Sequence, residues 1–221
     1  TMKRPHTLRE YQVIIPWSNT KRLVFKMAYR LLVVVGAVLA HAACGGGDTT
    51  IPTTASVVPS PTTWRGLLIA EENRCAPYNS NDYNYSQSVE DEIITRLGGI
   101  YSPYTGECFD SKSETDIEHI IARSEAHDSG LCAVDATTRS QFSSDLDNLT
   151  LASPSLNRYQ KIAKDAADWL PVNNRCWFAT TIIEVRRKYS LTIDRSEADA
   201  LDQVLATCAT VVLNRSTCTG G

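Results

Sequence analysis

The chain has 221 residues, with 22 Lys and Arg against 25 Asp and Glu, and its formal net charge at pH 7 is −3. The charge is unevenly distributed, because seven basic residues and only one acidic residue precede residue 44, which leaves 15 basic and 24 acidic residues and a net charge of −9 for the rest. This balance excludes nucleic-acid binding through a broad basic surface, so any such binding has to rely on a local basic strip and a metal.

Residues 27–43 have the order of an export signal. A short segment with one basic residue follows Met27, an apolar run extends from Leu31 to Ala40, and small residues precede Cys44. This order is typical of a signal peptide, and the apolar run is shorter than the about 20 residues that span a bilayer as a helix. We therefore expect an exported protein, with residues 1–26 as an upstream extension without a fold of its own.

Cys44 is the expected start of the mature chain. The three glycines after it resemble the beginning of a bacterial lipoprotein, which predicts lipidation of Cys44 and attachment to the cell envelope. His41 stands where such signals usually carry Leu, so cleavage near Ala42 with free secretion stays open. Residues 44–63 are rich in Gly, Thr, Ser and Pro, a composition typical of a flexible tether, so membrane contact is expected only through the lipid.

Residues 64–221 are long enough for one domain with its own core and too few to expect two. Apolar spacing predicts a helix at Val89–Leu97, with Ser88 as its N-cap and two glycines as its stop. The segments Asp116–Ile121 and Asn148–Ser153 are short and apolar or alternating, which predicts two strands.

Three further helices are predicted from apolar spacing, at Ser155–Trp169, Trp177–Tyr189 and Ser196–Val212. Ser196 with Asp199 three residues later predicts a capping pair at the start of the last one. Trp169 and Trp177 are expected to be core aromatic residues at helix ends rather than platforms for bases.

Setting Cys44 aside leaves six cysteines, which can pair as three disulfides in an oxidising compartment. Their spacing leaves the connectivity open. We expect Cys176 to pair with Cys208, because they flank two predicted helices, and Cys75 to pair with Cys108.

An ordered set of polar motifs lies in the middle of the chain. Asp-Ile-Glu-His at residues 116–119 is followed by Asp-Asn-Leu at 147–149 and by Leu-Asn-Arg at 156–158. The set resembles HNH nucleases, and it is especially similar to exported bacterial HNH proteins and to the nuclease domain of GmrSD-type restriction enzymes. The resemblance extends over about residues 64–218, although its specific core is 116–161. It implies an α+β fold, with a ββα-metal finger embedded in a mostly helical, disulfide-braced single domain.

The resemblance also implies a role for each matching residue. His119 corresponds to the general base that takes a proton from the attacking water, and Glu118 to the acidic metal ligand beside it. Asn148 corresponds to the residue that holds the loop and helps to orient the histidine, and Asn157 to the residue that completes the metal site. Asp116 is expected to give a supporting contact. A regular strand would point Glu118 and His119 to opposite faces, so the strand has to end or twist at His119.

Phosphodiester hydrolysis needs these residue types. Water is a poor nucleophile, and an imidazole accepts its proton at ordinary pH, while a metal stabilises charge on the phosphate and the leaving oxygen. Oxygen ligands favour one hard divalent ion, Mg²⁺ first and Mn²⁺ as the alternative. Arg158, Lys161 and Lys164 are expected to contact the phosphates beside Asn157, and residues 186–188 form a second basic spot.

The sequence therefore predicts a metal-dependent endonuclease that cleaves DNA, with RNA left open. No cluster of aromatic residues for reading bases is evident, which predicts little sequence preference. We expect a monomer without a small-molecule cofactor.

Other interpretations stay open at this point. Asn148 and Asn157 are also ordinary turn and helix-start residues, and a lysine-bearing helix face is usually solvated. A zinc-dependent cell-wall hydrolase would use His127 with His119, although no zinc-binding spacing is present and a solvated loop position is expected for His127. A non-catalytic surface-binding lipoprotein would not need His119.

Overall fold

The computed structural model describes residues 62–218. The expected extension, signal peptide and lipidation site at Cys44 lie outside these residues, as does nearly all of the expected tether. The regular elements that the structure describes are, in chain order, β1 (Thr63–Trp64), β2 (Leu67–Leu68), α1 (Val89–Leu97), β3 (Asp116–His119), α2 (Arg123–Asp128), α3 (Ala136–Ser144), β4 (Leu149–Ala152), a π-helical segment (Leu156–Lys161), α4 (Arg175–Lys188) and α5 (Arg195–Leu205). No helix among the described residues is long and apolar enough to cross a membrane.

Helix α1 confirms the prediction at Val89–Leu97. Its buried residues Val89, Ile93 and Leu97 recur at helical spacing, and acidic residues occupy its first turn, where they interact favourably with the helix dipole. Gly98 ends the helix with a φ of 79°, a left-handed conformation that glycine adopts without a steric penalty. Ser88 lies at the N-cap position, but its side chain makes no capping hydrogen bond.

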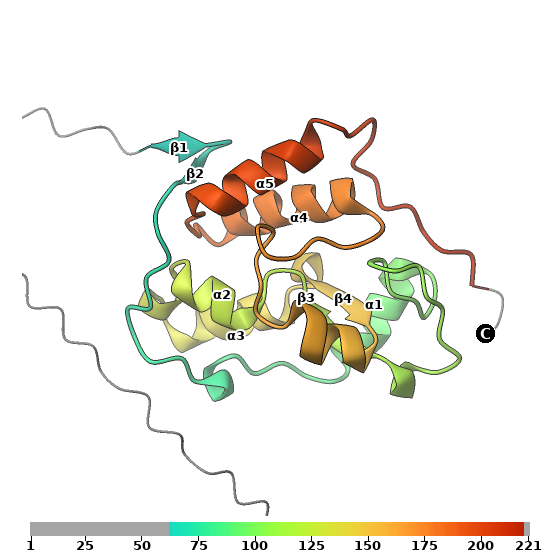
Figure 1. Cartoon of the computed structure of the whole chain (residues 1–221). Helices are drawn as coiled ribbons and strands as arrows, with labels where there is room; N and C mark the ends of the chain where they lie inside the picture. Colours follow the sequence, from blue (N-terminus) through green and yellow to red (C-terminus); the bar gives the residue numbers. More distant parts are fainter. Residues whose placement is uncertain (1–61, 219–221) are drawn as a thin grey trace, which may run out of the picture. The chain divides into compact units, whose positions relative to one another are not determined.

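Strands β3 and β4 form an antiparallel ribbon in which Ile117 pairs with Leu151, Glu118 with Thr150 and His119 with Leu149. Ile117, Leu149 and Leu151 share a small core with α1, which lies beside the ribbon (Figure 1). Side chains alternate between the two faces of a strand, so Glu118 belongs to the other face. Both predicted strands are confirmed, although β3 ends at His119 rather than at Ile121.

The prediction of a continuous helix at Ser155–Trp169 is wrong. The helical segment ends at Lys161, because the next residue, Ile162, has a φ of 54° and a ψ of −115°. The side chain of Lys161 is completely buried and lies 2.7 Å from Glu118. This polar contact turns Lys161 toward the ribbon, which the apolar periodicity of the segment could not reveal.

Helices α4 and α5 pack against each other and contribute Phe178, Ile182 and Leu201 to the larger core, as Figure 1 shows. Both predicted helices are present, but the predicted capping pair of Ser196 and Asp199 is wrong. Asp194 caps α5 instead, because its carboxylate accepts a hydrogen bond of 2.9 Å from the backbone nitrogen of Glu197. Helix α5 also ends at Leu205, well before the expected Val212.

The expected aromatic residues at the helix ends do pack against the larger core. Trp169 and Trp177 are both half-buried. Their rings lie 5.1 and 6.5 Å from that of the buried Tyr104, so both pack against the core as expected, although neither is fully buried and Trp169 does not end a helix.

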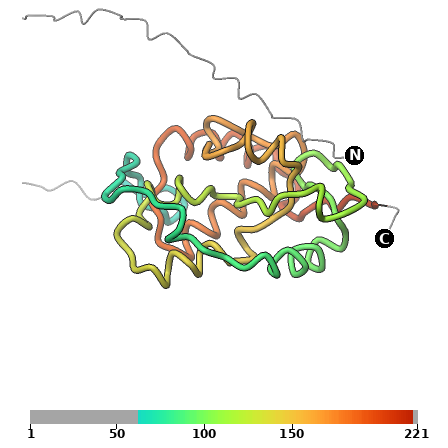
Figure 2. Tube along the Cα trace, turned by 90° about the horizontal axis from the view of Figure 1, so that it is seen from below, coloured from blue at the N-terminus to red at the C-terminus, as the bar shows by residue number. Residues whose placement is uncertain are grey.

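Three disulfides brace the described domain. Cys176 pairs with Cys208 as predicted, whereas the expected pairing of Cys75 with Cys108 is wrong. Cys75 pairs with Cys132, and Cys108 pairs with Cys218, 110 residues further along the chain. The C-terminal segment accordingly returns to the loops around residue 108 (Figure 2). Sequence spacing could not show this return.

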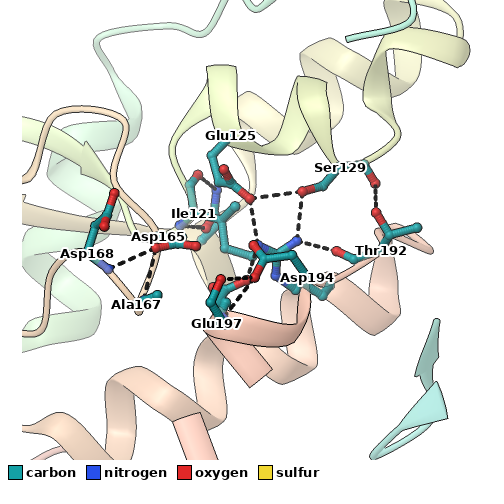
Figure 3. A network of polar contacts seen from close by, with 12 residues as sticks. Ile121, Glu125, Ser129, Asp165, Ala167, Asp168, Thr192, Asp194 and Glu197 are labelled. Atoms are coloured by element: carbon teal, nitrogen blue, oxygen red, sulfur yellow. Dashed lines mark hydrogen bonds and ion pairs between the residues drawn. The ribbon is translucent and has the colours of Figure 1, made fainter. Parts of the chain in front are cut away.

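A buried ionic cluster connects α2 with α4 and α5. Arg186 of α4 is fully buried and pairs with Glu125 at 2.7 Å and with Glu197. Figure 3 shows Glu125, Ser129, Thr192 and Glu197 converging in this network. The prediction of a basic surface at residues 186–188 is therefore wrong, because Arg186 is internal and Lys188 is paired with aspartates. Breaking a buried pair of this kind is strongly destabilising, so the cluster holds α2 in place.

Candidate active site

Four of the predicted site residues line one cavity of about 280 Å³. They are Glu118 and His119 from the end of β3, together with Asn157 and Arg158 from the π-helical segment. Strand β3 ends at His119, the ending that the resemblance to HNH nucleases required, and both residues at its end reach the cavity. The structure thus brings together residues that are about 40 positions apart in the sequence.

His119 is only 6% exposed, and its Nε2 lies 3.0 Å from the backbone oxygen of Ser143. A carbonyl only accepts hydrogen bonds, so Nε2 carries the proton and Nδ1 is left as the acceptor. Burial, followed by the positive charge of Arg123, lowers the pKa of His119 to about 3. The imidazole is therefore neutral at physiological pH, and the same burial makes its Nδ1 a weaker base than that of a solvated histidine.

Asn148 is completely buried and fixes the chain immediately after His119. Its side-chain oxygen accepts a hydrogen bond of 2.8 Å from the nitrogen of Ile121, and its side-chain nitrogen donates one of 3.1 Å to the oxygen of Ile121. Its own backbone oxygen accepts from Ile120 at 2.8 Å. These bonds replace the strand ladder at the point where the chain leaves β3. Asn148 does not line the cavity.

Lys161 is part of the interior and not of a substrate-binding strip. Its Nζ lies 2.7 Å from Oε1 of Glu118, which is 2% exposed. The contact is therefore a buried ion pair. The ammonium group also donates to the backbone oxygen of His119 at 2.9 Å. Burial raises the pKa of Glu118, and the attraction of Lys161 opposes this shift.

Asp116 organises the other two cavity residues. Its carboxylate accepts a hydrogen bond of 3.1 Å from the amide nitrogen of Asn157 and two bonds, of 2.7 and 2.6 Å, from Arg158. The amide oxygen of Asn157 is left available. Lys164 is exposed, donates to the backbone oxygen of Gln160 and lies outside the cavity lining. Of the three residues expected to contact phosphates, only Arg158 lines the cavity, and the expectation of a surface position is wrong for Lys161, which is buried.

The family model described as GmrSD restriction endonucleases, C-terminal domain, matches residues 70–204, which is more than half of the chain. The chain belongs to this family. The match includes every site residue named above, and membership supports a nuclease activity for this GmrSD C-terminal domain.

A fungal protein is also similar to this chain. A protein of Arthroderma benhamiae, described as an uncharacterized secreted protein, is 31% identical over 123 residues. The match spans 54% of this chain and 60% of that protein. No solved structure matches the chain.

The residues of the site fit an oxygen-coordinated divalent ion of the kind that the resemblance to HNH nucleases implies. Glu118 and Asn157 both line the cavity and offer a carboxylate and an amide oxygen, although Oε1 of Glu118 is paired with the ammonium of Lys161 at 2.7 Å. Hard ions prefer such ligands. Within the same residues, the only group of three or more closely placed acidic, His or Cys ligands is Glu72, Asp165 and Asp194, which includes neither Glu118 nor Asn157.

Sequence reasoning missed two residues of the GmrSD domain: Tyr85, whose ring contacts that of His119, and Arg123, whose positive charge lowers the pKa of His119. The ring of Tyr85 lies 5.2 Å from that of His119 at an angle of 67°, and the guanidinium of Arg123 lies 5.4 Å from the centre of the Tyr85 ring. Both line the cavity. Arg123 follows the Glu-His motif closely enough to be suspected, whereas Tyr85 lies in an irregular segment that carries no pattern.

His127 is not the solvated residue that we expected. It is completely buried, with Nδ1 at 2.8 Å from the hydroxyl of Tyr83 and Nε2 at 2.8 Å from the backbone oxygen of Ala76. Both ring nitrogens are thus engaged, and His127 does not line the cavity with His119. A zinc site that combines the two histidines has no support in this arrangement.

Proposed function

We propose that the protein is a metal-dependent endonuclease that hydrolyses phosphodiester bonds, with His119 as the general base. The observation that carries the proposal is the placement of His119. Its ring is held in one tautomer by Ser143 and lines the cavity that Glu118 and Asn157 also line. A fixed, unprotonated imidazole is what proton abstraction from water requires.

The neighbouring residues have separate tasks in this proposal. Glu118 and Asn157 hold one divalent ion, Mg²⁺ or Mn²⁺, which when bound stabilises negative charge on the phosphate. Arg123 and Arg158 contribute guanidinium groups to the same cavity, where they bind phosphate oxygens. Asn148 and Lys161 position the end of β3, since both bond to the backbone within two residues of His119.

The proposal also covers the nucleic-acid substrate and the export of the protein from the cell. DNA is the expected substrate, with RNA left open and with little sequence preference. Export is supported by the three disulfides, which form in oxidising compartments, and by the relative described as secreted. A lipid anchor at Cys44, a monomeric state and an HNH-type ββα finger remain parts of the proposal.

Plasmid nicking by the full chain tests this function. The oxidised protein is assayed with Mg²⁺, with Mn²⁺ and with EDTA, beside His119→Ala and the exposed control Arg195→Ala on α5. We expect metal-dependent cutting that falls by about 10²- to 10⁴-fold in His119→Ala, the usual contribution of a general base, and normal cutting by the control.

The competing function is that of a non-catalytic surface-binding protein. A folded wild type that is supplied with metal and cuts neither DNA nor RNA would favour it. Cutting that persists in His119→Ala would keep the nuclease and reject His119 as its base.

A further inference from the structure

Aromatic and apolar side chains gather around the candidate active site. Tyr78 and Tyr85 are half-buried and line the cavity. Ile162 also lines it and is 52% exposed. Tyr159 follows Arg158 in the same helical segment and is 76% exposed. The structure therefore places two tyrosines in the cavity lining and an exposed one next to Arg158 in the chain, which the sequence-based prediction of no aromatic cluster did not anticipate.

Cationic groups accompany these rings. Arg123 stacks on Tyr85 at 5.4 Å, donates one hydrogen bond to the backbone of Tyr83, and has no carboxylate partner among residues 62–218. Arg158 is 60% exposed at its side chain, although it pairs with Asp116. Rings beside guanidinium groups suit a ligand that carries both flat bases and phosphates.

The charge of the domain disfavours a duplex. Double-stranded DNA is held mainly by many Lys and Arg contacts along its phosphates, but the chain after residue 44 has a net charge of −9, from 15 basic and 24 acidic residues. Several basic residues are already paired with carboxylates, among them Arg74, Arg96 and Lys188. Affinity for nucleic acid has to come from another source.

The recessed position of His119 also disfavours a duplex. The residue is only 6% exposed, so a phosphate has to enter the cavity to reach its ring. A flexible strand can bend a phosphate inward and place its bases on exposed rings. A rigid duplex keeps its bases stacked on each other and out of reach.

We propose that the cavity and its rim take single-stranded nucleic acid, with Tyr85 inside the cavity and Tyr159 outside it as platforms for unpaired bases. This inference rests on the proposed nuclease function and names its substrate class. Arg123 contacts the phosphate between the stacked bases. Stacking on aromatic rings is indifferent to sequence, because every base has a flat face.

The test compares one labelled oligonucleotide as a single strand and as a duplex, cleaved by the full oxidised chain with Mg²⁺. We expect the single strand to be cut at least about tenfold more efficiently. Tyr159→Ala should raise KM for the single strand by roughly 5- to 150-fold, the range for loss of one stacked base, with little change in kcat. Tyr159→Phe should retain the wild-type KM, and so should Val172→Ala, which alters a residue that is 77% exposed and outside the cavity lining.

Binding measured separately distinguishes the two proposals. Fluorescence anisotropy of the same oligonucleotides is recorded in EDTA. Equal cutting of both forms, or a Tyr159→Ala variant that cuts like the wild type, would overturn this inference and leave the nuclease intact. Single-strand binding that depends on Tyr159, without any cutting, would support the inference and reject the nuclease. Neither binding nor cutting of the single strand would overturn both.

Discussion

Replacing Lys161 with Met should destabilise the protein more than any substitution of an exposed lysine. Lys161 is completely buried and lies 2.7 Å from Glu118, which is 2% exposed. Without the ammonium group, the carboxylate is left buried and uncompensated, which costs about 3–5 kcal/mol. In a domain of this size about 1 kcal/mol corresponds to roughly 2–4 °C in Tm, so we expect Tm to fall by roughly 6–20 °C.

Urea and thermal unfolding in EDTA, with the disulfides oxidised, measure this effect. The double variant Lys161→Met with Glu118→Gln removes both charges and should be more stable than Lys161→Met alone. Lys112→Met is the matched control, because Lys112 lies 2.6 Å from Asp91 but both side chains are at least half exposed. Its cost should stay below about 1 kcal/mol. A loss below about 1 kcal/mol in Lys161→Met, or a double variant that is less stable still, would refute the reasoning.

Two other predictions concern stability. Ile162 has a φ of 54°, which strains a β-branched residue by about 1–3 kcal/mol, while glycine costs roughly 1 kcal/mol of backbone entropy. Ile162→Gly should therefore raise the free energy of unfolding by roughly 1 kcal/mol in urea, and a decrease would show that packing of Ile162 outweighs the strain. The pKa of His119 is lowered from 6.5 to about 3, so between these values the unfolded chain binds a proton that the folded chain does not. Its contribution is complete above about pH 6.5 and is lost as the pH falls toward 3, which amounts to about 2 kcal/mol between pH 6.5 and pH 5. Urea unfolding at pH 7 and pH 5 in EDTA should show a smaller pH dependence in His119→Gln, and an equal dependence in both proteins would contradict the shift.

Local patterns in the sequence predicted the elements that depend on them. Apolar spacing with a glycine stop was sufficient to predict α1. The buried residues Val89, Ile93 and Leu97 can be recognised from their spacing along the chain alone. The order of Glu118, His119 and Asn157 was enough to expect them at one site, and the structure places all three around one cavity.

Features that depend on long-range partners were missed. Lys161 has the spacing of a helix-surface lysine, and only the position of Glu118 in the folded chain reveals why it is buried. Arg186 was misjudged for the same reason, because its two carboxylate partners come from α2 and α5. Disulfide connectivity is similarly non-local, since Cys108 meets a cysteine that follows it by 110 residues.

The disulfide connectivity also determines how the chain withstands proteases. The loop closed by Cys75 and Cys132 overlaps the loop closed by Cys108 and Cys218, so every peptide bond from Cys75 to Cys218 lies inside at least one closed loop. A single proteolytic cut anywhere in this stretch leaves both fragments in one covalent molecule. Exposed loop tips, where nicking usually starts, can therefore be cleaved once without releasing the piece that carries His119 from the piece that carries Asn157.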